Sequence, residues 1–210
     1  MTIKTVAILS PGEMGAAVGK ALHDNGFDII TTLEGRSAPT KDRAEAAGFR
    51  DSGSLDSLLG EADIVLCIMP PEYAPATADA VADAMRRSGH TPPYVDCNAI
   101  APETAKQIDA VITGAGATFT DSGIVGSPPG KTDKPTRFFT SGPDSAVMDV
   151  FDGRGIAVKQ CGPEIGRGSA VKMCYAGITK GTSALHAAVL VAAEALGVAE
   201  DLHEELEYSV

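Results

Sequence analysis

The chain is poor in the residues that nucleic-acid binding and membrane binding require. It contains no Trp, only 5% aromatic residues, and 17 Lys and Arg against 28 Asp and Glu, which gives 210 residues a net charge of −11. A protein that follows a phosphate backbone or lies on an anionic membrane needs a basic face. The shortage of aromatic rings also disfavours a platform for stacking single-stranded bases. These absences predict a protein that binds neither nucleic acids nor membranes.

Cysteine is scarce and is not grouped. The four cysteines form no CxxC pair, so zinc-ribbon spacing is missing and no metal site is expected. We expect reduced thiols that pack as small hydrophobic groups in a cytoplasmic protein. The longest apolar stretch, at 181–196, is too short to span a bilayer and contains His186 and Glu194, so it favours a buried helix.

Short apolar runs alternate with helical patterns through the first 165 residues. Strands are expected at 5–9, 28–33, 63–69, 94–96, 119–121, 137–140 and 156–158. Helices are expected at 14–23, 40–48, 55–59, 74–87, 102–113 and 144–151. Alternation at this spacing is typical of βαβ units, so we expect an α/β fold with a doubly wound, mostly parallel Rossmann sheet.

The pattern changes after residue 165. One long helix is expected at 166–196, and at about 1.5 Å per residue it would span roughly 45 Å, more than one Rossmann layer needs. A second helix begins at 201–208. We therefore expect an NAD(P)-binding domain at 1–165, and at 166–210 the long helix and the start of an incomplete helical domain for substrate binding or dimerisation. Either the chain was cut, or a homodimer covers the long helix.

A phosphate-binding turn follows the first expected strand and opens the first helix. Its residues, read against GxGxxG, are Ser10, Pro11, Gly12, Glu13, Met14 and Gly15. Gly12 would let the backbone approach a pyrophosphate, and Gly15 would let helix and strand pack closely. The helix N-terminus adds N–H groups and a favourable dipole for an anion. Ser10 replaces the first glycine, which changes little if its φ stays negative.

The end of the second strand would select between the two nicotinamide cofactors. Glu34 could bind the ribose hydroxyls, which favours NAD, whereas Arg36 and Ser37 could hold a 2′-phosphate, which favours NADP. We expect NADP, because Arg36 and Ser37 lie where the strand releases the chain toward the ribose. NAD remains the alternative.

Four segments resemble the β-hydroxyacid dehydrogenases, a family that includes 6-phosphogluconate and 3-hydroxyisobutyrate dehydrogenases. PGEMG at 11–15 is similar to the family's GLGxMG, and DCNAIAP at 96–102 is similar to its substrate-binding D-x-S/N-T/A-x-S/A-P. DSGIVGS at 121–127 resembles D-A-P-V-S-G, and GRGSAVK at 166–172 matches G-x-G-x-x-x-K. The resemblance covers the whole chain. KMCYAGITKG at 172–181 also resembles a branch with a small helical domain after the long helix.

The resemblance implies NAD(P)-dependent oxidation of a small β-hydroxy acid, or reduction of the carbonyl product. Lys172 matches the family's catalytic lysine, which exchanges a proton with the substrate hydroxyl as hydride moves. A lysine among Ala, Met, Cys and Tyr is poorly solvated, which can bring its pKa toward the working pH. The alternative is a lysine that reaches solvent from one helix face.

Other segments would line the substrate and the nicotinamide. Asn98 follows a strand end and could hold a substrate carboxylate, helped by the backbone N–H groups of Ala99 and Ile100, or it could cap the helix near Pro102. By resemblance, the substrate side is lined by Val125, Gly126 and Ser127. Also by resemblance, the loop along the nicotinamide ribose contains Met69, Pro70 and Pro71, with Asn98 nearby.

One departure keeps other functions open. The family usually has Asn four residues after the lysine, and here that position is Ala176. The missing amide motivates one alternative, a dinucleotide-binding protein without catalysis. A second alternative, an imine or ketone reductase, resembles the same architecture, although that branch commonly lacks the lysine.

Overall fold

The computed structural model describes residues 2–209 and contains one eight-stranded sheet. The strands are β1 (Thr5–Leu9), β2 (Asp28–Thr31), β3 (Arg50–Asp51), β4 (Ile64–Cys67), β5 (Tyr94–Asp96), β6 (Phe119–Val125), β7 (Arg137–Ser141) and β8 (Ala157–Gln160). Their order is β3-β2-β1-β4-β5-β6-β7-β8. β1 to β6 are parallel, β7 is antiparallel to β6, and β8 is parallel to β7. The expected doubly wound, mostly parallel sheet is confirmed, and its first six strands have the Rossmann order.

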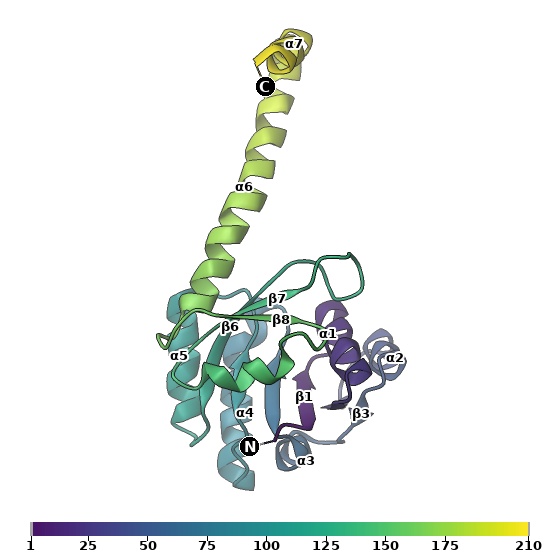
Figure 1. Cartoon of the computed structure of the whole chain (residues 1–210), viewed down its shortest axis with the longest axis vertical. Coiled ribbons are helices and arrows are strands. Elements are labelled where there is room, and N and C mark those ends of the chain that lie inside the picture. The colour runs from purple at the N-terminus through teal and green to yellow at the C-terminus, as the bar shows by residue number, and fades with distance from the viewer. Residues whose placement is uncertain (1, 210) are drawn as a thin grey trace. The chain divides into compact units, whose positions relative to one another are not determined.

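Helices cover both faces of this sheet (Figure 1). The helical segments before the C-terminal part are α1 (Glu13–Asp24), α2 (Ala38–Ala46), α3 (Leu55–Glu61), η1 (Pro71–Tyr73), α4 (Ala74–Ser88), α5 (Pro102–Thr113) and η2 (Ser145–Phe151). Val6 and Ile8 of β1 pack with α1, α2 and η2, whereas Ala7 and Leu9 pack with α3, α4 and α5. Because both faces are buried, the strand is apolar at consecutive positions.

Three segments differ from the sequence expectation. The segment expected as a helix at 144–151 forms the 3₁₀-helix η2. β3 was not expected, because its two residues are exposed and charged: Arg50 pairs with Asp28 and Glu61. β6 continues four residues beyond the expected end at Asp121, because the sheet buries Ser122 as well as the following apolar residues.

The C-terminal part consists of α6 (Arg167–Leu196) and α7 (Ala199–Ser209), close to the expected helices. By contacts, the chain divides inside α6 into Met1–Met173 and Cys174–Val210. The expected functional boundary after residue 165 stays a prediction. Among residues 174–209, Ala193 is the one buried residue, so 181–196 is not a buried helix within one chain. No helix in the described residues has the length and apolar character needed to cross a membrane.

Candidate cofactor and active site

Three neighbouring strands end in register at one edge of the sheet, and the adjacent strand β6 runs four residues beyond them. Leu9 of β1 pairs with Cys67 of β4, Cys67 with Asp96 of β5, and Asp96 with Asp121 of β6. The segments that follow Leu9, Cys67 and Asp96 therefore leave the sheet side by side, next to the extended end of β6. In open α/β sheets, ligands bind outside this edge, where the strand order reverses, here between β1 and β4.

The turn between β1 and α1 contains two glycines, and the requirement for glycine differs between the two positions. A Cβ added to Gly15 would lie 2.9 Å from the carbonyl oxygen of Ser10, so the packing of α1 against the turn requires glycine there. A Cβ added to Gly12 would meet its nearest atom at 4.0 Å, so the protein itself leaves room for a side chain. Gly12 is the N-cap of α1. A ligand that approaches this backbone closely would account for glycine at position 12.

Ser10 has a φ of +66°, so the condition under which its replacement of glycine would change little is not met. It is the one non-glycine residue with positive φ in the described part of the chain. Its carbonyl oxygen accepts a 2.7 Å hydrogen bond from the Gly12 N–H, which closes the turn tightly. A left-handed backbone is strained for residues with a Cβ. The loss of the first glycine is therefore a structural cost at this turn, rather than a neutral change.

Two basic residues from distant segments hold the turn. Lys131, in the loop between β6 and β7, forms an ion pair with Glu13 at the start of α1. The hydrogen bond and charge of Lys131 lower the pKa of the Glu13 carboxyl. Arg43 of α2 donates a 3.3 Å hydrogen bond to the carbonyl oxygen of Pro11. Met14 is half-buried against the core. The loop after β6 is thereby tied to the start of α1.

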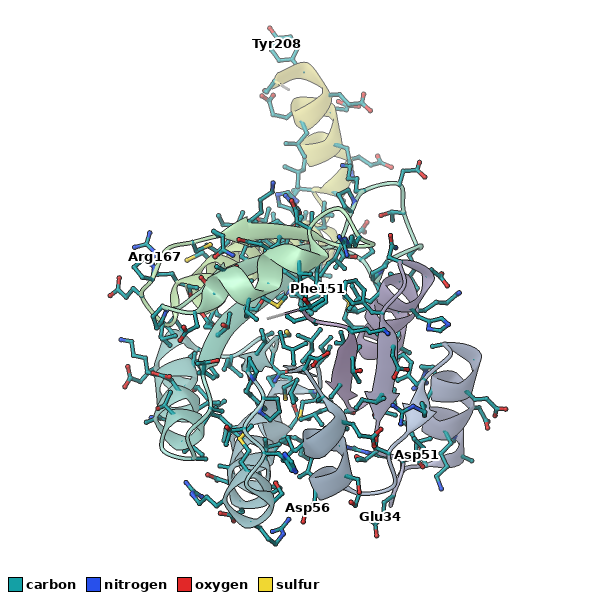
Figure 2. The ribbon with its side chains drawn as sticks, turned by 60° about the horizontal axis from the view of Figure 1, so that its bottom comes forward. Glu34, Asp51, Asp56, Phe151, Arg167 and Tyr208 are labelled. Atoms are coloured by element: carbon teal, nitrogen blue, oxygen red, sulfur yellow. The ribbon has the colours of Figure 1, made fainter. Side chains whose placement is uncertain are left out.

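Two charged candidates for cofactor selection, Glu34 and Arg36, follow β2, and one of them lines a cavity. Arg36 lines a cavity of about 280 Å³ together with Leu9, Thr32 and Tyr73. Glu34 is exposed, and Figure 2 shows its side chain directed away from the ribbon. Ser37 is the N-cap residue of α2. Tyr73 was not identified as a candidate from the sequence. Its signal there is its position, an aromatic residue close after Pro70 and Pro71. Both of these prolines are exposed.

Asn98 joins two strand ends and is 2% exposed. Its Oδ1 accepts a 2.7 Å hydrogen bond from the Met69 N–H, and its Nδ2 donates 3.0 Å to Oδ2 of Asp96. The alternative role as a cap for the helix at Pro102 is wrong, because α5 has no side-chain cap. The turn here is made by Asp96, whose Oδ1 accepts from the Asn98 N–H at 2.9 Å. Binding of substrate by the Asn98 amide would need to replace one of these bonds.

Burial changes the acid–base properties of this strand edge. Desolvation raises the pKa of the Asp96 carboxyl to about 6, although hydrogen bonds from Asn98 act in the opposite direction. Burial also raises the pKa of the Cys67 thiol to about 12 and that of the Cys97 thiol well above its ordinary value. Both thiols are free and buried, as expected, and burial in apolar surroundings disfavours the reactive thiolate.

The N-terminal part of α6 packs on β6 and thereby brings Lys172 next to this strand. A Cβ added to Gly123 would be 2.7 Å from the Lys172 Cβ and 2.6 Å from the Gly168 carbonyl oxygen. Glycine at position 123 thus allows α6 to lie directly on the strand. Lys172 is half-buried. The structure therefore brings the matched lysine to the strand that carries the DSGIVGS segment.

The remaining candidates for substrate binding differ in exposure. Val125 is buried within β6, whereas Gly126, with φ of +117°, and Ser127 are exposed. The Ser127 carbonyl oxygen accepts a 2.6 Å bond from the hydroxyl of Thr136. Ala99 is exposed and Ile100 is buried. Their roles in substrate binding stay predictions.

Sequence reasoning assigned no structural role to four buried polar residues of β5, β7 and the β6–α6 contact. They are Asp96, Asp121, Ser141 and Ser169. The available signal was an acid inside an apolar strand, in YVD at 94–96 and FTD at 119–121. No group of three or more His, Cys, Asp or Glu side chains in the described residues could hold a metal ion.

Comparisons of the sequence point to one family. Residues 5–152 match the family described as the NAD binding domain of 6-phosphogluconate dehydrogenase. The mitochondrial 3-hydroxyisobutyrate dehydrogenase of Drosophila melanogaster is 28% identical over 169 residues, 76% of this chain and 49% of that protein. The NADP(+) ketol-acid reductoisomerase of Haloarcula marismortui is 38% identical over 82 residues, 39% of this chain and 23% of that protein. The chain thus spans less than half the length of these two curated relatives.

Solved structures share the fold. A conserved protein of unknown function, described as structurally similar to 3-hydroxyacid dehydrogenases, has a TM-score of 0.77 and 32% identity, covering 98% of this chain and 76% of its own. The 3-hydroxyisobutyrate dehydrogenase of Mycobacterium tuberculosis, solved with L-serine, has a TM-score of 0.74 and 24% identity, with coverage of 94% and 67%. The imine reductase of Myxococcus stipitatus, solved with NADP+, has a TM-score of 0.73 and 17% identity, with coverage of 96% and 70%.

Proposed function

The chain belongs to the family of the NAD-binding domain of 6-phosphogluconate dehydrogenase, and we propose that it is an NAD(P)-dependent oxidoreductase acting on a small β-hydroxy acid or its carbonyl product. The observation that carries this proposal is the contact between α6 and β6. It puts Lys172 beside Gly123, near the sheet edge where the cofactor turn also lies. A proton-transfer group next to a nicotinamide site is what oxidation of an alcohol requires.

In the proposed reaction, Lys172 exchanges a proton with the substrate oxygen. The bound nicotinamide supplies or accepts the hydride. During oxidation, the substrate hydroxyl gives its proton to the Lys172 amine as its carbon loses hydride, and reduction reverses both transfers. Free N–H groups would hold the substrate carboxylate: within the described residues, neither Ala99 nor Ile100 donates a backbone hydrogen bond. Lys172 acts as the general acid or base.

The preferred cofactor in this proposal is NADP. Arg36 faces a cavity that also includes the end of β1, and Ser37 at the N-cap of α2 lies next to it. A guanidinium beside a helix N-terminus suits a 2′-phosphate, because it adds donors and positive charge to the N–H groups of the helix. Glu34 and Arg36 are both exposed, but Glu34, the NAD-favouring residue, is not among the residues that line this cavity and is directed away from the ribbon in Figure 2.

A substrate panel tests the proposal against its two alternatives. NADPH consumption is followed with β-keto acids and semialdehydes, and separately with cyclic imines and simple ketones. We expect turnover with the carboxylate-bearing substrates. Turnover confined to imines or neutral ketones would favour the reductase, an alternative based on the architecture shared with imine reductases. Tight NADPH binding without turnover of any compound would favour a non-catalytic dinucleotide-binding protein, for which Ala176 in place of Asn is the motivating observation.

We also propose that the protein works as a cytoplasmic homodimer. In residues 174–209, a single chain leaves large apolar side chains exposed, among them Ile178, Leu185, Val191 and Leu196. Soluble monomers seldom expose that much apolar surface, and a second copy would cover the same residues on both chains. Sedimentation of the wild type and of Val191→Glu tests this: we expect a dimer that the substitution weakens, and a wild-type monomer would contradict it.

A further inference from the structure

The carboxylate of Asp121 binds the first turn of α6. Asp121 has no exposed surface. Its Oδ2 accepts hydrogen bonds of 2.9 Å from the Ser169 N–H and from the Ser141 hydroxyl, and its Oδ1 accepts one of 2.5 Å from the Ser169 hydroxyl. The Ser141 oxygen accepts a 3.0 Å bond from the Gly168 N–H. Two N–H groups that a helix start leaves without partners are therefore satisfied by β6 and β7.

The negative charge at this helix start comes from a distant residue. The first turn of α6 contains no acidic residue. The charged residue of this turn, Arg167, is a cation; it is exposed, pairs with Glu164, and is directed outward in Figure 2. A carboxylate near a helix N-terminus is favourable, and hydrogen bonds to a charged acceptor are about twice as strong as neutral ones. Asp121 thus supplies the cap that the local sequence of α6 lacks.

Two glycines bring this helix start into direct contact with the sheet. A Cβ added to Gly168 would lie 2.2 Å from the Phe139 carbonyl oxygen, and one added to Gly123 would lie 2.7 Å from the Lys172 Cβ. Ser169 precedes Lys172 by three residues, about one helical turn, so both lie on the same side of α6. The bonds from Asp121 to Ser169 therefore also fix where Lys172 leaves the helix.

We propose that Asp121 is a positioning residue that holds the first turn of α6 on β6 and so sets the position of Lys172. This inference rests on the proposed function, in which Lys172 exchanges a proton with the substrate. A buried carboxylate costs free energy through desolvation unless it is well hydrogen-bonded. Here three hydrogen-bond donors compensate the burial of the Asp121 carboxylate. Two belong to Ser169 in the first turn of α6, and the third is the hydroxyl of Ser141, which itself accepts from the Gly168 N–H of that turn.

Two substitutions at Asp121 separate charge from hydrogen bonding. In Asp121→Asn, the amide oxygen can accept from the Ser169 N–H and the Ser141 hydroxyl, and the amide nitrogen can donate to the Ser169 oxygen. Asp121→Ala removes every one of these bonds. Thr140→Val is the matched control, because Thr140 is the buried neighbour of Ser141 and its hydroxyl has no hydrogen-bond partner among the described residues. Ser141→Ala is the milder variant, in case Asp121→Ala does not fold.

We expect kcat to fall by about 100-fold in Asp121→Ala, because a displacement near 1 Å of a catalytic group has an effect of this size. The dissociation constant of NADPH should stay within about twofold, since the turn at Gly12 is built from other contacts. Asp121→Asn should recover most of the wild-type kcat. The kcat of Ser141→Ala should lie between those of Asp121→Ala and the wild type, and the kcat of Thr140→Val should equal that of the wild type. A folded Asp121→Ala protein with wild-type kcat would overturn the proposal.

A readout without turnover separates this inference from the proposed function. Amide hydrogen exchange of the peptide 167–173 and labelling of the Lys172 amine with acetic anhydride are both measured by mass spectrometry. In Asp121→Ala we expect exchange in that peptide to rise at least tenfold and the labelling rate of Lys172 to change, with the rest of the sheet unaffected. If the wild type turns over no substrate, the proposed function fails. If exchange and labelling are the same in Asp121→Ala, the positioning role fails.

Discussion

The carboxamide oxygen of Asn98 accepts a 2.7 Å hydrogen bond from the Met69 N–H, so one buried side chain ties the segment after β5 to the segment after β4. Its amide nitrogen is held by Asp96 of its own strand. These segments are the ones expected to line the substrate and the nicotinamide ribose. Asn98 therefore fixes the geometry between the two halves of the candidate site.

Asn98→Ala should destabilise the protein. The substitution leaves the Met69 N–H without its acceptor and removes one donor from the buried Asp96 carboxylate, and such losses cost roughly 2–3 kcal/mol of unfolding free energy. Urea denaturation measures the effect. Asn25→Ala is the control, because Asn25 is exposed and its side chain donates one hydrogen bond, to the Ala21 carbonyl; the substitution should change stability by less than about 0.5 kcal/mol. If both substitutions changed the unfolding free energy equally, the proposed structural role of Asn98 would be contradicted.

The stability of the protein should depend on pH through Asp96. Burial raises the pKa of Asp96 from 3.8 to about 6. Between these values the folded state binds more protons than the unfolded state, so the unfolding free energy falls as pH rises from about 4 to 6 and stays lower above that window. The full difference is roughly 3 kcal/mol. We would measure denaturation of wild type and Asp96→Asn at several pH values, since the variant lacks this titration. Stability curves that run parallel in both proteins would contradict the assignment.

Gly12→Ala should separate cofactor binding from folding. The protein leaves 4.0 Å around an added Cβ at this position, so the unfolding free energy should change little. The methyl group would occupy the space needed by a pyrophosphate, so the dissociation constant of NADPH should rise by at least tenfold. Gly15→Ala is the comparison, because its Cβ would meet the Ser10 carbonyl and should reduce stability. Fluorescence titration and urea denaturation measure both quantities, and unchanged affinity in Gly12→Ala would count against the cofactor site.

Arg36 should decide the preference between NADP and NAD. Arg36→Ala removes the cation that lines the cavity with Thr32 and Tyr73, so we expect NADPH affinity to fall by roughly tenfold or more while NADH affinity is unchanged. Glu34→Ala is the matched control and should leave NADPH affinity as it is. A wild type that binds NADH more tightly than NADPH would contradict the choice of cofactor.

Local sequence pattern predicted most of the fold. The apolar run of β4 identified a parallel strand because both of its faces are buried, and Pro102 at the first turn of α5 marked that helix start. The helix type of the segment at 145–151 was harder to predict. The Gln160 side chain at the end of β8 donates hydrogen bonds to the Ser145 carbonyl and to the Asp149 carboxylate of this segment. Such bonds between distant residues are not encoded in local propensity, and the segment forms a 3₁₀-helix.

The candidate site was predicted only in part, for a similar reason. Motif spacing located the turn, Asn98 and Lys172. The groups that hold them lie far away in sequence: Asp121 is 48 residues before Ser169, and Lys131 is 118 residues after Glu13. Likewise, the left-handed backbone of Ser10 depends on how the turn is closed, which the residue type alone does not reveal.

The catalytic role of Lys172 is the central claim, and one measurement tests it most directly. The kcat of NADPH oxidation with the best β-keto acid of the panel is compared between wild type, Lys172→Ala and Lys180→Ala, which removes an exposed lysine of the same helix. Loss of a general acid or base predicts that kcat falls by about 10²–10⁴-fold in Lys172→Ala with NADPH affinity kept, and that Lys180→Ala behaves as wild type. Unchanged kcat in a folded Lys172→Ala protein would contradict the account.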